Sequence, residues 1–298
     1  MRHLWVIGGV QDRQAGVLDR DHKPLYGLGR VVKLDVVTGT AQIVLDWRHP
    51  EGDGHALKGA TATLDGLLLC GQKRVVAWTP TQGITDSWSH PFLHDAHHAL
   101  HHDGALWVTS TAADGIVRRK GTQVDFFPVV LGATGDKPRA KSRAHPNHLF
   151  IWRGRLWVTR LHLRDAVEVE GTGRIALGDE RIHDGVVVED TPWFTAVDGH
   201  LVTPERAYDL KPLDPRTGPL GWCRGLVIDG AVAWVGFSRL RATRWRSHLA
   251  WVRGQMRGKT LVTSHPTRVT GYDLDRGTVV GDWPVPLDAV FGLVPVAG

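Results

Sequence analysis

A short apolar segment behind a tight turn recurs along this 298-residue chain, and it restricts the fold more than any other feature. The recurrences are 64–72 (LDGLLLCGQ), 103–111 (DGALWVTST), 152–160 (WRGRLWVTR), 189–197 (EDTPWFTAV) and 228–237 (IDGAVAWVGF). They begin about 37 to 50 residues apart, and further apolar runs stand before and after each one. Short runs rich in Val, Trp and Thr, broken by DG or RG turns, predict antiparallel β-strands and exclude helical repeats. Each repeat is therefore expected to be a four-stranded blade.

The two ends of the chain supply one more blade. Segments 3–9, 29–39 and 40–47 predict three strands without an innermost strand, and the C-terminal run 289–296 predicts a strand without companions. Pairing them closes a ring and removes the exposed sheet edges that an open array would leave. We therefore predict an all-β, six-bladed β-propeller that occupies residues 1–298 as a single domain.

Composition agrees with many short strands joined by turns, since the chain has 35 Gly, 16 Pro and 13 Trp but only 3 Tyr. The N-terminus runs directly into a strand, and no apolar run approaches the roughly 20 residues of a membrane helix. A cytoplasmic protein without membrane contact is expected. Cys70 and Cys223 stand in separate apolar runs without metal-type spacing. We expect reduced core residues, with a disulfide as the alternative.

Basic charge is concentrated in segment 239–260, although the net charge of the whole chain is only +5. The segment contains no acid, and its cations are Arg239, Arg241, Arg244, Arg246, Arg253, Arg257 and Lys259. Trp245, Leu249, Val252 and Met256 recur at roughly helical spacing, which predicts a short basic helix inserted in the fifth full blade. The segment is either a solvated excursion packed on the protein body or a site for an anion, a nucleic acid or an acidic partner.

The innermost strand of each blade should line a central channel, and the repeat shows which residues share a register there. Ten residues before the tryptophans of four second strands stand polar residues: His97, Asn147, His183 and Arg224. Two positions earlier, on the same face of an alternating strand, stand Asp95, His145, Arg181 and Trp222. One position later, and therefore expected to point away, stand His98, His148, Asp184 and Gly225.

The same alignment divides the dense histidine run 94–102. His101 and His102 flank the next turn and are expected to be solvated, while His94 at the start of the strand stays open. His97 is the best candidate for a channel position, and a strand bulge would exchange its role with that of His98.

Three phrases carry a resemblance: HPNHLFIWRGRLWVT (145–159), GWCRGLVIDGAVAWVGFSRLR (221–241) and VTGYDLDRGTVVGDW (269–283). They resemble a bacterial family of conserved hypothetical β-propellers of unknown function, distantly related to the lactonase and strictosidine-synthase propellers. The resemblance covers most of the chain, and its most specific part is RGL followed by AWVGFS. It implies that the conserved site positions are His97, His145, Asn147, His183, Arg224 and Gly225.

Two features depart from that family pattern. The family usually has an acidic pair and an Asp in its last strand, whereas this chain has Gly292 at the place of the Asp and Asp288 as the only acid there. The basic segment after Ser238 is also longer and more cationic. The resemblance therefore supports the fold and the position of a site, and it does not define a reaction.

The first hypothesis is a metal-dependent hydrolase, lyase or oxidase. His97, His145 and His183 would bind Zn, Fe or Cu, since imidazoles from different blades can leave a coordination position open for substrate. Side chains that could hold an anionic small-molecule substrate are Asn147, Arg224, His98, His148 and Trp222, with Arg224 binding its carboxylate or phosphate.

A metal-free variant uses His97 or His183 as general base, with Asp95 or Asp184 as the orienting partner. A propeller that binds an anionic small molecule without turnover is an alternative, and so is a scaffold for protein or nucleic acid that uses the basic segment. Polar residues in a channel can also simply hold trapped water. The sequence has no motif for a nucleotide cofactor.

Overall fold

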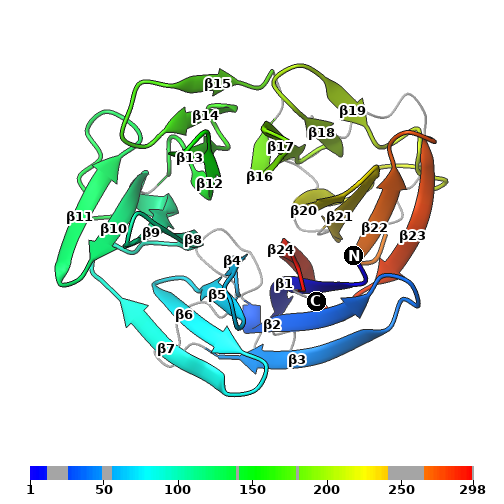
Figure 1. Ribbon diagram of the computed structural model, residues 1–298, viewed down its shortest axis with the longest axis horizontal. Coiled ribbons are helices and arrows are strands. Elements are labelled where there is room, and N and C mark those ends of the chain that lie inside the picture. The colour runs from blue at the N-terminus through cyan, green and yellow to red at the C-terminus, as the bar shows by residue number, and fades with distance from the viewer. Residues whose placement is uncertain (12–25, 49–55, 139–140, 179–180, 241–264, 297–298) are drawn as a thin grey trace.

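The chain folds into six four-stranded antiparallel sheets arranged in a ring, which confirms the six-bladed β-propeller (Figure 1). The computed structural model describes residues 1–11, 26–48, 56–138, 141–178, 181–240 and 265–296. Within these residues the only helix is the single 3-10 turn η1 (Thr111–Ala113), so the fold is all-β as predicted. None of the described helical structure has the length or apolar character needed to cross a membrane.

Five blades are continuous in the sequence, and each runs from its innermost to its outermost strand. They are β4 (Gly59–Ala62), β5 (Leu67–Cys70), β6 (Arg74–Thr79) and β7 (Gly83–Ser89); β8 (Ala96–His102), β9 (Ala105–Ser110), β10 (Gly115–Lys120) and β11 (Gln123–Pro128); β12 (Pro146–Trp152), β13 (Arg155–Arg160), β14 (Asp165–Glu168) and β15 (Arg174–Ala176); β16 (Ile182–Val188), β17 (Thr191–Ala196), β18 (His200–Val202) and β19 (Ala207–Asp209); and β20 (Trp222–Asp229), β21 (Val232–Ser238), β22 (Arg268–Asp273) and β23 (Thr278–Pro284).

The remaining blade joins the two ends of the chain as predicted. Its strand order is β24 (Ala289–Pro295), β1 (His3–Gln11), β2 (Tyr26–Asp35) and β3 (Ala41–Trp47). The last strand pairs antiparallel with the first, so that β24 takes the innermost place and β1 lies beside it. Six innermost strands, β4, β8, β12, β16, β20 and β24, thereby surround the centre of the ring (Figure 1).

Five of the six innermost strands carry a β-bulge at the same point, β24 among them at Phe291. In β8, Ala96 pairs with Ser110 and Ala99 with Val108, so His97 and His98 together face Thr109. Equivalent register shifts occur near the start of β12, β16 and β20. A bulge adds one residue to one strand and re-aims the side chains there. Strict alternation of side chains is therefore broken at the predicted site.

Threonine hydroxyls from the second strands hold two of these bulges. Thr109 Oγ1 accepts the backbone N–H groups of His97 (3.1 Å) and His98 (2.9 Å). Thr159 Oγ1 accepts the N–H of His148 at 3.1 Å. Each threonine stands two residues after the repeated tryptophan, so the repeat itself encodes this threonine clamp, the set of hydrogen bonds from bulge N–H groups to one hydroxyl. Backbone donors that the strand ladder leaves open thus find buried partners.

The fifth full blade replaces this threonine by Gly236. A Cβ atom there would lie 2.4 Å from the carbonyl oxygen of Arg224, so the close approach of two strands requires glycine. The bulged N–H of Gly225 instead donates to the Asp184 carboxylate of the neighbouring blade at 2.7 Å. Asp184 therefore does for this blade what Thr109 and Thr159 do for theirs.

The predicted basic segment 239–260 falls in the connection from β21 to β22. Residues 241–264 lie outside the described part of the chain, and with them the predicted helix.

Replacing Thr109 by Val should lower the free energy of unfolding by about 1–3 kcal/mol, since two buried N–H groups lose their acceptor. Urea unfolding followed by tryptophan fluorescence measures the change. Thr85→Val, on the exposed face of β7, is the matched control and should change stability by no more than about 0.5 kcal/mol. Equal effects of the two substitutions would show that the clamp does not hold the bulge.

Candidate functional site

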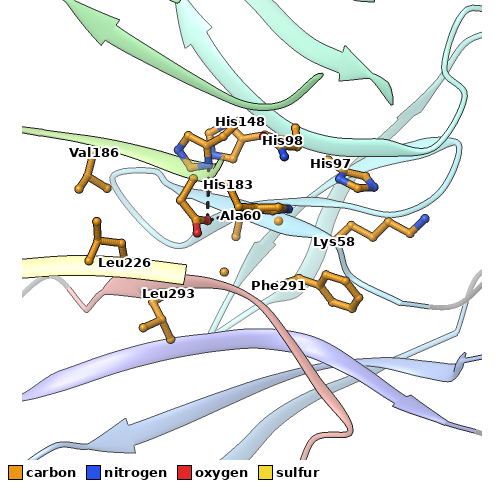
Figure 2. A pocket seen from close by; sticks show the side chains of 14 residues that line it. Lys58, Ala60, His97, His98, His148, His183, Val186, Leu226, Phe291 and Leu293 are labelled. Atoms are coloured by element: carbon orange, nitrogen blue, oxygen red, sulfur yellow. Dashed lines mark ion pairs between the residues drawn. The ribbon is translucent and has the colours of Figure 1, made fainter. Parts of the chain in front are cut away.

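A small cavity is enclosed by residues from the innermost strands of all six blades, with Lys58 directly before β4 (Figure 2). Its polar lining side chains are Lys58, His97, His98, Asn147, His148, His183 and Asp184. On one side, Figure 2 shows the apolar side chains of Val186, Leu226 and Leu293. The cavity volume is about 20 Å³, which is room for a single water molecule.

Consecutive residues line this cavity, contrary to the expectation from strand alternation. The prediction that His98, His148 and Asp184 point away from the site is wrong, because each lines the cavity beside the residue before it. The bulges are the physical reason, since each adds a residue at this point of its strand.

His97 combines burial with a carboxylate partner. Its side chain is 6% exposed, and its Nε2 lies 3.4 Å from the Asp95 carboxylate, which also pairs with Lys58. Its Nδ1 is buried and has no hydrogen-bond partner among the described residues. Burial, and then the charges of Lys58, His183 and Arg224, hold the pKa of His97 well below its ordinary value. The ring is therefore neutral at neutral pH, and its Nδ1 is available as a proton acceptor.

His183 and Asp184 form a second pair of this kind. His183 Nδ1 lies 3.5 Å from Asp184 Oδ1, and the His183 side chain is 2% exposed. The other Asp184 oxygen accepts hydrogen bonds from the Thr195 hydroxyl (2.5 Å) and the Gly225 N–H (2.7 Å). Burial alone would raise the pKa of Asp184. His183, His148 and Thr195 together lower this pKa by more than burial raises it, so the carboxylate stays ionised. Burial and then Arg224 lower the pKa of His183.

His98 ties three blades together. Its Nδ1 accepts the backbone N–H of Leu149 in the next blade at 3.2 Å. Its Nε2 lies 3.0 Å from the Thr61 hydroxyl of the previous blade, and that hydroxyl donates to the Ala99 carbonyl at 2.6 Å. Nε2 therefore carries the proton and donates it to Thr61. Both ring nitrogens have protein partners, which leaves His98 no open nitrogen for a substrate.

His148 stacks on His98 with ring centroids 3.8 Å apart, and its Nδ1 lies 4.0 Å from Asp184. Asn147 also has structural partners, since its Oδ1 accepts the Thr159 hydroxyl at 2.5 Å and its Nδ2 donates to the Ile182 carbonyl at 3.4 Å. The predicted substrate-binding roles of His148 and Asn147 stay predictions, but both side chains already join neighbouring blades.

His145 lies directly before β12, edge-to-face with His97 at a centroid distance of 5.1 Å. Asp114, which sequence reasoning missed, fixes its backbone by accepting the N–H groups of Arg143 (2.8 Å), Ala144 (2.9 Å) and His145 (3.2 Å). The signal in the sequence is the Asp114-Gly115 turn after β9, the second strand of the previous blade. The Asp114 carboxylate contacts the backbone directly before β12.

Arg224 and Trp222 lie partly exposed near the start of β20. The guanidinium group of Arg224 stacks over Trp222 (5.9 Å to the ring centroid) and over Phe291 of β24 (5.2 Å). Phe291 and Lys58 are further site residues that sequence reasoning missed, because no histidine or repeated register marks them. Arg181, at the start of β16, is exposed.

The two histidines at the C-terminal end of the run 94–102 are in contact with solvent, as predicted. His101 is exposed and His102 partly exposed at the end of β8, beyond the cavity. His94 is partly buried before the strand begins, and its backbone N–H donates to the Ser110 hydroxyl at 3.0 Å.

The predicted metal ligands do not form a metal site in the described residues. The ring of His97 lies 5.1 Å from that of His145 and 6.3 Å from that of His183, between centroids. Across the part of the chain that the structure describes, no three His, Cys, Asp or Glu side chains are grouped to hold an ion. The Zn, Fe or Cu site stays a prediction.

Comparison with known proteins supports the fold alone. The chain matches no model of a known protein family and none of the curated proteins. A protein of unknown function from Bacteroides caccae has a similar structure, with a TM-score of 0.64, 13% identity and coverage of 100% of this chain and 99% of that chain. So does a candidate 6-phosphogluconolactonase from Bacteroides fragilis, with a TM-score of 0.55, 10% identity and coverage of 99% and 98%. A chain of the nidogen–laminin complex matches with a TM-score of 0.59, 11% identity and coverage of 97% of both chains.

Acid should destabilise the protein through its buried imidazoles. Burial, partly offset by Asp184, lowers the pKa of His148 to about 4, whereas an unfolded histidine titrates near 6.5. Between these values the unfolded state binds a proton that the folded state does not. Stability therefore falls as the pH drops below about 6.5, by about 1.4 kcal/mol per pH unit for this group, and the loss ends near pH 4.

Urea unfolding of wild type and His148→Gln between pH 8 and pH 4 measures this contribution. The variant should lose less stability than wild type over that range. His101→Gln, at an exposed position, serves as control and should follow wild type. Parallel curves for wild type and His148→Gln would contradict the assignment.

Proposed function

We propose that this chain is an enzyme that performs general acid–base chemistry on a small anionic substrate where the innermost strands begin. The observation that carries the proposal is His97, a buried neutral imidazole with Asp95 at Nε2 and with Nδ1 unpartnered among the described residues. A general base needs this arrangement, in which one nitrogen is oriented by an acid and the other accepts the proton.

The surrounding charges favour an anionic substrate. Arg224 offers a guanidinium group that can bind a carboxylate or phosphate, and Lys58 adds a second cation beside Asp95. Trp222 and Phe291 flank Arg224 and provide flat apolar surfaces next to its charge. A substrate with an acidic group and an apolar body would match these side chains.

The size of the cavity supports a substrate whose body stays outside it. A volume of about 20 Å³ is room for one water-sized group, so the body of a substrate would stay outside the cavity and only its reacting end would approach His97. The partly exposed Trp222 and Arg224 would then contact the remainder of the molecule.

Binding without turnover is the second candidate, because the Arg224 stack could hold an anion whether or not His97 reacts. A metal-dependent reaction and a scaffold role for segment 239–260 stay predictions.

We also propose membership of the bacterial propeller family that the sequence resembles, and a cytoplasmic location. The second point is supported by Cys70 and Cys223, which are both buried free thiols, as a reducing compartment would keep them.

A panel of small carboxylates and phosphate esters, screened by thermal shift and then by NMR for turnover, tests the function. For a panel member that is turned over, His97→Gln should lower kcat by about 10²- to 10⁴-fold with little change in KM. Arg224→Gln should instead weaken binding by about 10- to 100-fold, the loss expected for a charge-assisted hydrogen bond.

His101→Gln provides the control, since His101 is exposed at the other end of the same strand. Stabilisation by an anion without turnover, unaffected by His97→Gln, would leave only the binding function. The proposal fails entirely if no member of the panel shifts the melting temperature.

A further inference from the structure

We infer that the cavity holds one water molecule between His97 and His183, and that this water is the reacting nucleophile, which makes the enzyme a hydrolase. The inference rests on the proposed function and narrows it to one reaction class. The water, which is the second reactant, would lie between His97 and His183.

The cavity has room for one water molecule. Its volume is about 20 Å³, just above the roughly 10–15 Å³ that a water molecule requires. Dry cavities in proteins are apolar, whereas this one has imidazoles, a carboxylate and an amide among its lining side chains. Polar groups enclosed at this density are normally bridged by ordered water.

Among the side chains that line the cavity, three buried nitrogen atoms lack a hydrogen-bond partner in the described residues: His97 Nδ1, His183 Nδ1 and His183 Nε2. An unsatisfied buried polar atom costs about 1–3 kcal/mol, so a partner for these atoms would stabilise the fold. The two rings have centroids 6.3 Å apart. That separation suits one water that bridges them with hydrogen bonds of about 2.8–3.0 Å.

The two carboxylates set the tautomers that this water meets. Asp95 lies 3.4 Å from His97 Nε2, and Asp184 lies 3.5 Å from His183 Nδ1. Protons on these two nitrogens face negative charge, so His97 Nδ1 and His183 Nε2 remain as acceptors. A water between them donates both hydrogens and leaves its oxygen lone pairs for an electrophile.

A small anion or cation would fit this cavity less well. Burial keeps both imidazoles neutral, as the lowered pKa values of His97 and His183 indicate. Lys58 is already paired with Asp95, and apolar side chains form much of the remaining wall. A neutral molecule that donates two hydrogen bonds matches these partners.

The hydrolytic step follows from this arrangement. The water oxygen forms a bond to the carbonyl carbon of an ester in the substrate, while one water proton moves to His97 Nδ1. The tetrahedral intermediate then breaks its bond to the leaving oxygen, which takes the proton back from His97. A carboxylic acid and an alcohol are released, and both imidazoles return to their starting tautomers.

Gly292 provides a test that leaves the histidines intact. It lines the cavity, and a Cβ added there would have its nearest neighbours at 3.7 Å (Ala60 N) and 3.8 Å (Gly59 Cα), which is ordinary contact. Gly292→Ala should therefore fold normally and reduce the space that is open to the water. Ala207→Val, at an exposed position of β19, adds methyl groups far from the cavity as control.

High-resolution crystal structures provide the first readout. Wild type should show one water peak within hydrogen-bond distance of His97 Nδ1 and His183 Nε2, and Gly292→Ala should show none, with both rings unmoved. An empty cavity in wild type, or a peak that belongs to an ion, would overturn the inference.

Hydrolysis of mono-4-nitrophenyl succinate, an activated ester with a carboxylate, provides the second readout. Gly292→Ala should lower kcat by about 10²-fold or more with KM unchanged, while Ala207→Val behaves as wild type. Wild-type hydrolysis no faster than that of His97→Gln would overturn the hydrolase assignment, and so would full activity in Gly292→Ala. These failures are distinct from failure of the proposed function, in which no anion of the panel binds at all.

Discussion

Backbone N–H groups at a buried β-bulge have no partner in the strand ladder, and the rest of this site depends on how they are satisfied. Thr109 supplies one hydroxyl for the two successive donors of His97 and His98, and Asp184 supplies a carboxylate for Gly225. With the donors satisfied, the extra residue of a bulged inner strand is stable in the protein interior. Two neighbouring side chains can then line the cavity from a single strand, which is how six short strands provide so many polar groups.

Four imidazoles that line one cavity differ in what their nitrogens already contact. His98 uses both nitrogens to join its blade to its two neighbours, and His148 stacks on it beside Asp184. His97 and His183 each face one carboxylate and keep another nitrogen unpartnered among the described residues. The first pair therefore joins neighbouring blades at this level of the ring, and the second pair carries the chemistry that we propose.

The blades and their closure were predictable because turns and alternating apolar runs are local signals. The register of His97 and His183 was predictable too, since each lies a constant distance from the tryptophan across the same hairpin. The inward orientation of His148 and Asp184 was not, because a bulge depends on pairing with the next strand. Contacts such as Lys58 with Asp95 join different blades, and the intra-blade repeat contains no information about them.

Closure of the ring by β24 links the order of synthesis to the completion of the cavity. Phe291, Gly292 and Leu293 form one wall, and they belong to the strand of the propeller that is synthesised last. Until that strand pairs with β1, the imidazoles of the other blades face solvent on one side and would be protonated more easily. A chain shortened before β24 would thus lack one wall of the cavity, so the site is complete only when β24 has paired with β1.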